Sequence, residues 1–196
     1  MPRYFLLDKP YDVLSQFTRE APHHRTLADV YDFPPRVYPV GRLDRDSEGL
    51  LLLTDDASLN QRVLHPEAGH GKTYRAQVEG IPTTADLRAL AAGVTIRIRK
   101  RDYHCTPLEA GFLPAASVAA IPPRTPPVRH RERIPTTWLS LTLTEGKNRQ
   151  VRRMCAAVGF PVLRLRRFAI GGITLDDLGG QTVREVGREW LLTRLR

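Results

Sequence analysis

Residues 41–56 read GRLDRDSEGLLLLTDD, and this stretch joins a dense cluster of charges to the most apolar run of the chain. Five charged side chains of both signs fall within seven residues: Arg42, Asp44, Arg45, Asp46 and Glu48. Gly49 and four consecutive leucines follow directly. A short apolar run bounded by turn signals is typical of a strand buried on both faces. The stretch therefore predicts a polar turn at the edge of a core strand, with charges that can neutralise one another.

The turn itself favours an extended backbone around Asp44. An extended segment directs Arg42 and Asp44 to one face and Leu43 to the other, towards the core. Arginines on both sides favour the ionised form of the Asp44 carboxylate. An aspartate in this setting can be a nucleophile, a general base or only the partner of an ion pair, and spacing alone does not choose among them.

The remaining pattern predicts an α+β fold, because strands follow one another without regular alternation with helices. A mixed, largely antiparallel sheet is expected. The predicted strands are 3–7, 11–17, 37–43, 49–54, 72–79, 94–99, 117–121, 137–143 and 162–170. The predicted helices are 57–64, 84–92 and 148–158, the second behind a capping box formed by Thr83 and Asp86. A loop with five prolines and four arginines spans 121–135 and is expected to be stiff and extended.

Composition places the chain among ordinary globular proteins. With 196 residues, 41% hydrophobic and 26% charged, it fits one domain that buries a sizeable core. No apolar run approaches the roughly 18–20 residues of a membrane span. The first residues lack the apolar core of a signal peptide. Two cysteines, Cys105 and Cys155, are too few for a disulfide framework, which favours a reducing cytoplasm.

The positive charge is concentrated in one part of the chain. The net charge is +9, and residues 121–167 hold eleven Lys and Arg against two acids, so this window contains the whole excess. The rest of the chain has nineteen residues of each sign. A polyanion, and nucleic acid first of all, is the partner that such a window predicts. No basic amphipathic helix accompanies it, so a membrane partner is not expected.

The usual catalytic and cofactor motifs are missing from the sequence. It has no HExxH, CxxC, GxSxG, Walker loop or GxGxxG. Its histidines at 23, 24, 65 and 70 form no metal-ligand pattern with nearby carboxylates. Any chemistry is therefore expected to proceed without a metal or redox cofactor.

Three motifs together resemble the pseudouridine synthases that modify ribosomal RNA and have a small-subunit-type catalytic domain. GRLDRDSEGLLLLTDD resembles the signature that contains the essential aspartate of this family, GKTYRAQVEG (71–80) its K-x-Y segment, and TEGKNRQVRRMCAAVGFPVLRLRRFAIG (144–171) its third motif. The resemblance extends over roughly residues 9–184. It implies two lobes that flank a central RNA-binding cleft, in one catalytic domain over 1–196, and a reaction without a cofactor.

The resemblance also implies roles for individual residues. Asp44 is the expected catalytic residue, Tyr74 packs on the target base, and Arg152 pairs with the aspartate, with Arg153 as the second choice. Arg42 fills the space of the flipped base or holds a phosphate, and Leu165 forms an apolar wall. The expected contacts to RNA backbone are the basic residues of the charged window: Arg124, Arg129, Arg131, Arg133, Lys147, Arg149, Arg164, Arg166 and Arg167.

Within this family the chain is similar to the E type of the synthases that modify large-subunit (23S) rRNA. KPYDVLSQFT begins within the first twenty residues, which leaves no room for the N-terminal S4-type module of most members. The type implies a uridine in the peptidyl-transferase region of 23S rRNA as the target, and the protein is expected to act as a monomer. Alternatives are the same chemistry on 16S rRNA or tRNA, and a non-catalytic RNA-binding or ribosome-assembly protein. A DNA-binding regulator is disfavoured because no helix-turn-helix or zipper is present.

Overall fold

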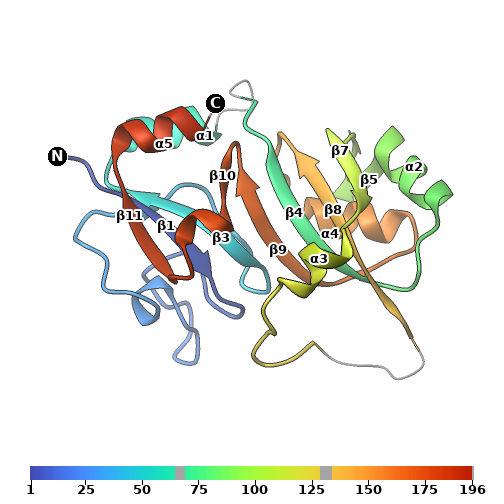
Figure 1. The fold of residues 1–196 in the computed structure, drawn as a ribbon, viewed down its shortest axis with the longest axis horizontal. Coiled ribbons are helices and arrows are strands. Elements are labelled where there is room, and N and C mark those ends of the chain that lie inside the picture. The colour runs from blue at the N-terminus through green and yellow to red at the C-terminus, as the bar shows by residue number, and fades with distance from the viewer. Residues whose placement is uncertain (65–68, 129–133, 196) are drawn as a thin grey trace. The chain divides into compact units, whose positions relative to one another are not determined.

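The computed structural model describes residues 1–64, 69–128 and 134–195, and the chain divides into two compact units. The first unit comprises 1–70 and 166–196, and the second comprises 71–165. Strand β9 (Val162–Ile170) begins in the second unit and ends in the first. Figure 1 shows the path of the chain.

The first unit is built on strands in the order β11-β1-β3-β9. Its elements are β1 (Tyr4–Lys9), a 3-10 turn η1 (Leu27–Asp29), β2 (Tyr38–Pro39), β3 (Glu48–Thr54), α1 (Ala57–Leu64), β10 (Ile173–Thr174), η3 (Leu175–Leu178), β11 (Val183–Val186) and α5 (Arg188–Arg194). Strand β1 is antiparallel to both β11 and β3, whereas β3 and β9 are parallel. The short strands β2 and β10 add antiparallel pairs to β3 and β9.

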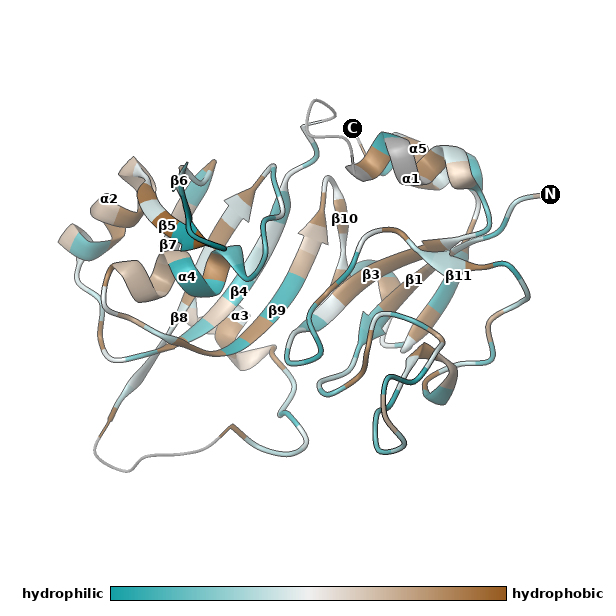
Figure 2. Cartoon of the chain, turned by 180° about the vertical axis from the view of Figure 1, so that it is seen from behind, coloured by the Kyte–Doolittle hydropathy of each residue, from teal (hydrophilic) through white to brown (hydrophobic). Residues whose placement is uncertain are grey.

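The four leucines of β3 are consecutive because the strand is covered on both faces. Leu50 and Leu52 belong to a core cluster with side chains of α1 and α5, which lie side by side in both views (Figures 1 and 2). Leu51 and Leu53 belong to a second cluster with the irregular segment between residues 13 and 37. All four are at most 1% exposed. The prediction of a strand buried on both faces is confirmed.

Gly49 allows β3 and β9 to pair closely. Its φ is +104°, a region that side-chain-bearing residues rarely adopt. A Cβ at this position would lie 2.3 Å from the carbonyl oxygen of Arg167, the residue opposite Gly49 in the parallel register. The glycine between the charge cluster and the leucines is therefore a steric requirement of the sheet.

The second unit contains an antiparallel sheet of order β4-β8-β7 and a separate hairpin β5-β6. Its elements are β4 (Lys72–Glu79), α2 (Thr84–Ala92), β5 (Val94–Ile98), β6 (Arg101–Cys105), β7 (Glu109–Phe112), α3 (Ala115–Ala119), β8 (Thr136–Leu143) and α4 (Gln150–Ala157). The capping box of α2 forms as predicted, since the Thr83 Oγ1 accepts from the Asp86 N–H and the Asp86 carboxylate accepts from the Thr83 N–H. The α+β class and the largely antiparallel sheet are confirmed.

Two of the predicted strands are wrong and a third is much shorter. Residues 11–17 form an irregular segment with one bridge, Val13 to Arg25, because Pro10 and the positive φ of Asp12 (59°) turn the chain. Residues 117–121 lie largely in the helix α3, where an alanine-rich sequence follows Pro114. The predicted strand 37–43 is reduced to the two residues of β2.

Candidate active site

In the first unit, the segment from Arg42 to Ser47 forms the turn that the sequence predicted. The Ser47 N–H donates to the Asp44 carbonyl oxygen at 3.0 Å, which closes the turn just before β3. Leu43 is buried, Arg42 is exposed, and Asp44 is half-buried. Leu43 therefore anchors the turn to the core while its two charged neighbours lie nearer to the solvent.

The Ser15 hydroxyl holds the Leu43 peptide groups from both sides. It donates to the Leu43 carbonyl oxygen at 2.8 Å and accepts from the Leu43 N–H at 3.1 Å. Ser15 is 3% exposed and Leu43 is 7% exposed, so water does not replace these bonds easily. One buried hydroxyl thus fixes the backbone on both sides of the residue that precedes Asp44.

A second clamp holds the other end of the turn. The Asp12 N–H donates to the Arg45 carbonyl oxygen at 2.9 Å, and the Arg45 guanidinium pairs with the Asp12 carboxylate at 3.0 Å. The expectation that the cluster neutralises itself is thus corrected for Arg45, which forms this ion pair with a residue outside the cluster. Gln16 accepts from the Arg42 guanidinium at 3.3 Å. The segment 12–16 therefore contacts the turn at three successive points.

Lys9 places a buried ammonium group beneath this turn. Its side chain is fully buried and donates to the Pro10 and Val13 carbonyl oxygens at 2.8 and 2.7 Å. Burial lowers the pKa of Lys9 from 10.5 to about 8, although the negative charges of Glu48, Asp46, Asp12 and Asp44 act to raise it. The acidic side chains of the charge cluster therefore help to keep a buried cation protonated near neutral pH.

Three arginines expected on the RNA-binding surface are buried instead. Arg164, Arg166 and Arg167 are at most 6% exposed. The Arg166 guanidinium pairs with Asp8 at 2.7 Å, Arg167 Nε donates to the Leu50 carbonyl oxygen at 2.8 Å, and Arg164 donates to the Pro122 carbonyl oxygen at 2.9 Å. Their placement on an exposed binding surface is therefore wrong, because each is buried and bonds to another group of the protein.

In the second unit, Tyr74 and Leu165 occupy buried positions. Tyr74 is 9% exposed and shares a face of β4 with Ala76 and Val78, which are fully buried. Leu165 on β9 is 6% exposed. Most of the Tyr74 ring thus packs against protein, and its contact with a base stays a prediction.

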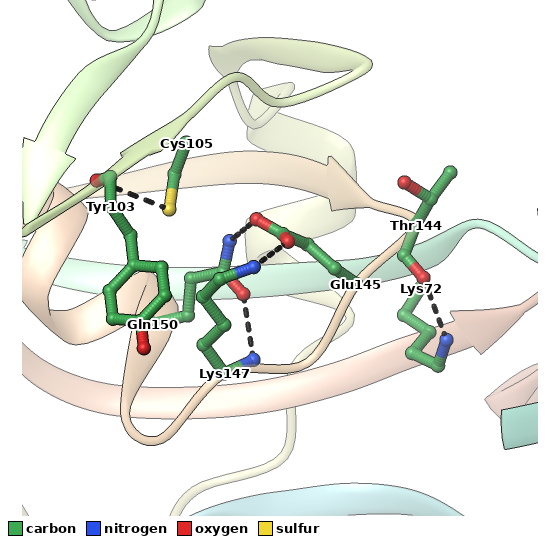
Figure 3. A network of polar contacts seen from close by, with 7 residues as sticks. All are labelled: Lys72, Tyr103, Cys105, Thr144, Glu145, Lys147 and Gln150. Carbon is green, nitrogen blue, oxygen red and sulfur yellow. Dashed lines mark hydrogen bonds and ion pairs between the residues drawn. The ribbon is translucent and has the colours of Figure 1, made fainter. Parts of the chain in front are cut away.

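The third motif (144–171) begins with a network of polar contacts in the loop that precedes α4 (Figure 3). Gln150 is 4% exposed; its amide donates to Glu145 at 2.5 Å, and its amide oxygen accepts from the Lys147 N–H at 2.9 Å. The Lys147 ammonium pairs with the same carboxylate. Burial acts to raise the pKa of Glu145, but the hydrogen bonds from Lys147 and Gln150 hold it below its ordinary value. The network fixes the loop that leads to Arg149, which is exposed and has a left-handed backbone with φ of 51°.

The two arginines proposed as partners of Asp44 have different surroundings. Arg152 Nη1 donates to the Val162 carbonyl oxygen at 3.1 Å and is half-buried. Arg153 donates through Nη1 to the Arg97 carbonyl oxygen at 2.8 Å and through Nε to that of Asn148 at 3.3 Å. The Arg153 guanidinium thus joins α4 to the β5-β6 hairpin. This bond disfavours Arg153 as a partner of Asp44.

The other expected RNA contacts lie in the proline-rich segment. Arg124 donates to the carbonyl oxygens of Pro126 and Pro127 at 2.7 and 3.0 Å, so its side chain folds back on its own loop. Arg129, Arg131 and Arg133 lie outside the described residues.

The cysteines are not activated. Burial raises the pKa of Cys155 to about 12, and burial together with Glu145 raises the pKa of Cys105.

Within residues 1–64, 69–128 and 134–195, no three His, Cys, Asp or Glu side chains gather as metal ligands. Over the same residues, no helix is both long and apolar enough to span a bilayer.

Three supporting residues were not predicted from the sequence: Ser15 and Lys9, which hold the turn in the first unit, and Gln150, which holds the loop before α4 in the second. Ser15 and Leu43 are 28 positions apart, so no local pattern connects them. Lys9 did carry a signal, because a lysine ends the apolar run YFLLDK, and β1 is buried throughout most of its length. A charge inside such a strand indicates a buried polar contact.

Comparison with known proteins identifies the class. The family model described as RNA pseudouridylate synthase matches residues 3–157, so the chain belongs to that family of enzymes. A solved structure titled "Crystal structure of pseudouridylate synthase" superposes with a TM-score of 0.77 at 26% identity, and the match covers 100% of this chain and 74% of that one.

Curated relatives narrow the resemblance to one type. The chain is 52% identical over 174 residues to "Ribosomal large subunit pseudouridine synthase E" of Xanthomonas axonopodis pv. citri, with 88% of each chain covered. It is 47% identical over 176 residues to the protein of the same name from Vibrio vulnificus, with 90% of this chain and 71% of the relative covered. The predicted resemblance to synthases of the E type is confirmed.

Proposed function

We propose that this enzyme converts one uridine of 23S ribosomal RNA, in the peptidyl-transferase region, to pseudouridine, and that it acts as a monomer in the cytoplasm. The names of the E-type relatives support a ribosomal RNA substrate. The observation that carries the proposal for the site is the clamped turn, in which Ser15 and Asp12 fix the backbone on both sides of Asp44. Such support is what a catalytic group needs to be held in a productive position.

The reaction requires no external reactant. The bond between uracil N1 and ribose C1′ breaks, the base turns, and C5 bonds to C1′, while C5 loses a proton and N1 gains one. The target uridine must first leave the helical stack, which costs a few kcal/mol. Arg42 is exposed beside the turn and is proposed to fill the vacated space or to hold a flanking phosphate.

Asp44 is the proposed catalytic residue. Its carboxylate either attacks C1′ as uracil leaves or removes the C2′ proton to form a glycal, and both routes need it ionised. The proposed source of compensating positive charge is the Arg152 guanidinium. Tyr74 is proposed to stack on the uracil and Leu165 to supply an apolar wall.

Charged side chains of the second unit are proposed to bind the RNA backbone. Lys147 and Arg149 directly precede α4, and the polar network of Figure 3 fixes the loop that carries them. Arg124 and the arginines of 129–133 remain candidates for the same role.

Mapping pseudouridines with and without the gene tests the target. Deletion is expected to remove one pseudouridine from the peptidyl-transferase region of 23S rRNA, and a plasmid copy is expected to restore it. A plasmid copy with Asp44→Asn is the matched control and is expected to restore nothing. Loss of a pseudouridine from 16S rRNA or tRNA instead would contradict the proposed target, while loss of none would contradict the reaction.

A further inference from the structure

We propose that the tip of the β5-β6 hairpin is an additional binding site for the phosphate backbone of RNA. The residues of this basic hairpin are Arg97, Arg99, Lys100 and Arg101, and they lie outside the basic window of residues 121–167. The proposal rests on the proposed function for its substrate, and it adds a contact that none of the three motifs contains.

The turn of the hairpin has a backbone that its residues do not favour. Ile98 pairs with Arg101, so Arg99 and Lys100 alone form the two-residue turn. Their φ angles are 47° and 68°, both in the left-handed region. Two-residue turns of this kind strongly prefer Asn-Gly, because in most other residues the Cβ atom clashes with the backbone in the left-handed region. Folding alone therefore does not account for an Arg-Lys pair here, and strain of this kind is often found at functional sites.

The charges of the basic hairpin are exposed and largely uncompensated. Four cations and Asp102 give residues 97–102 a net charge of +3. Arg97 and Asp102 are 3.8 Å apart, but their side chains are 70% and 61% exposed, so this pair contributes little. In the part of the chain that the structure describes, no carboxylate is paired with Arg99, Lys100 or Arg101. Figure 2 shows β6 in the hydrophilic colour.

The hairpin is firmly attached to the third motif. Ile96 and Ile98 alternate with the exposed residues of β5 and are 3% and 9% exposed. The Arg153 guanidinium of α4 donates to the Arg97 carbonyl oxygen at 2.8 Å, and the Lys147 ammonium lies 5.4 Å from the centre of the Tyr103 ring on β6. RNA bound along the beginning of α4 would therefore meet the basic hairpin next.

The chemistry of the hairpin favours a phosphate backbone over a membrane. Guanidinium groups match phosphate oxygens in a bidentate fork. A membrane-binding element would also expose large apolar side chains, whereas the isoleucines of this hairpin face inward.

A double substitution in the turn separates RNA binding from folding, because it should lower the affinity for RNA while it raises the stability of the protein. Arg99→Asn with Lys100→Gly removes two charges and installs the preferred turn. The melting temperature is expected to rise, while affinity for transcribed 23S rRNA falls. If each residue makes one phosphate contact, the magnitude of the slope of log affinity against log salt decreases by about 1.4–1.8. This corresponds to roughly a 25- to 60-fold loss of RNA affinity at 0.1 M salt. The turnover rate at saturating RNA should be unchanged.

Two further variants serve as controls. Arg99→Gln with Lys100→Gln removes the charges but keeps the strained turn, so affinity should fall as in the first variant without a gain in stability. Arg62→Gln with Arg88→Gln removes two exposed charges from α1 and α2, and should have a much smaller effect on the salt slope.

The proposal is overturned if the hairpin variants bind RNA with the wild-type affinity and salt slope, or if the α1 and α2 control loses as much affinity. It is also overturned if the variants keep RNA binding but lose binding to phosphatidylglycerol vesicles. A wild-type protein that binds 23S rRNA through this hairpin but forms no pseudouridine would contradict the proposed function and leave the hairpin site intact.

Discussion

Replacing Ser15 by alanine should destabilise the protein and slow catalysis while RNA binding is preserved. The substitution removes one oxygen atom and with it both hydrogen bonds to Leu43, at 2.8 and 3.1 Å. A buried backbone group that loses its partner costs about 1–3 kcal/mol, and here an N–H and a carbonyl are affected. Because the two bonds share one hydroxyl, we expect a loss of about 2–4 kcal/mol in the free energy of unfolding.

Urea denaturation followed by circular dichroism measures this loss. Ser58→Ala is the matched control, because among the described residues the Ser58 hydroxyl bonds only to Asp56, at the exposed start of α1. Its removal should cost well under half as much. A loss below about 0.5 kcal/mol for Ser15→Ala, with an unchanged m value, would refute the conclusion that the Ser15 hydroxyl holds the Leu43 backbone.

The kinetic result separates positioning from general stability. Loosening the backbone beside Asp44 should lower kcat by about tenfold or more, below the melting range of the variant, with KM for RNA nearly unchanged. Ser15→Thr keeps the hydroxyl and should recover most of kcat. If kcat and KM of Ser15→Ala both matched the wild type, the clamp would not position Asp44.

Three further predictions concern other contacts. Gly49→Ala should lower the free energy of unfolding by at least about 3 kcal/mol, because the added Cβ would lie 2.3 Å from the Arg167 carbonyl oxygen. An unchanged urea midpoint would contradict the parallel pairing of β3 and β9, and Gly146→Ala, where the Cβ would enter open space, is the control. Lys9 has a pKa of about 8 in the folded chain and 10.5 in the unfolded chain, so unfolding takes up a proton when the pH lies between these two values. In that range the free energy of unfolding should rise by up to about 1.4 kcal/mol per pH unit, and urea titrations at several pH values should show that Lys9→Met lacks this slope. Tyr74→Phe should bind RNA like the wild type, whereas Tyr74→Ala should lose about 1–3 kcal/mol; equal binding by both variants would contradict stacking.

Periodicity predicted several of the regular elements. The strands 72–79 and 162–170 and the helices 57–64 and 84–92 have the predicted limits, because alternation, capping and length all pointed the same way. Residues 11–17 contain the apolar and aromatic side chains of a strand but pack onto a face of the sheet as an irregular segment, and composition cannot show whether a backbone has a neighbour to pair with. Strand β6, with its run of charged residues, gave no apolar signal and was missed.

The candidate site was predicted only in part for a related reason. The motifs located Asp44 and the segment around Arg152, since these are patterns within short stretches. The clamp by Ser15 and the burial of Lys9 depend on segments that fold together from distant positions. The burial of Arg164, Arg166 and Arg167 depends likewise on neighbours of β9, so a count of charges along the sequence overestimated the exposed basic surface.

Catalysis by Asp44 is tested most directly by the turnover of purified Asp44→Asn on transcribed 23S rRNA. The change keeps the shape of the side chain and removes its charge and basicity. We predict at least a ~10³-fold loss of pseudouridine formation, with the unfolding free energy and RNA affinity close to wild type. Turnover within tenfold of the wild type would show that Asp44 is not the catalytic residue.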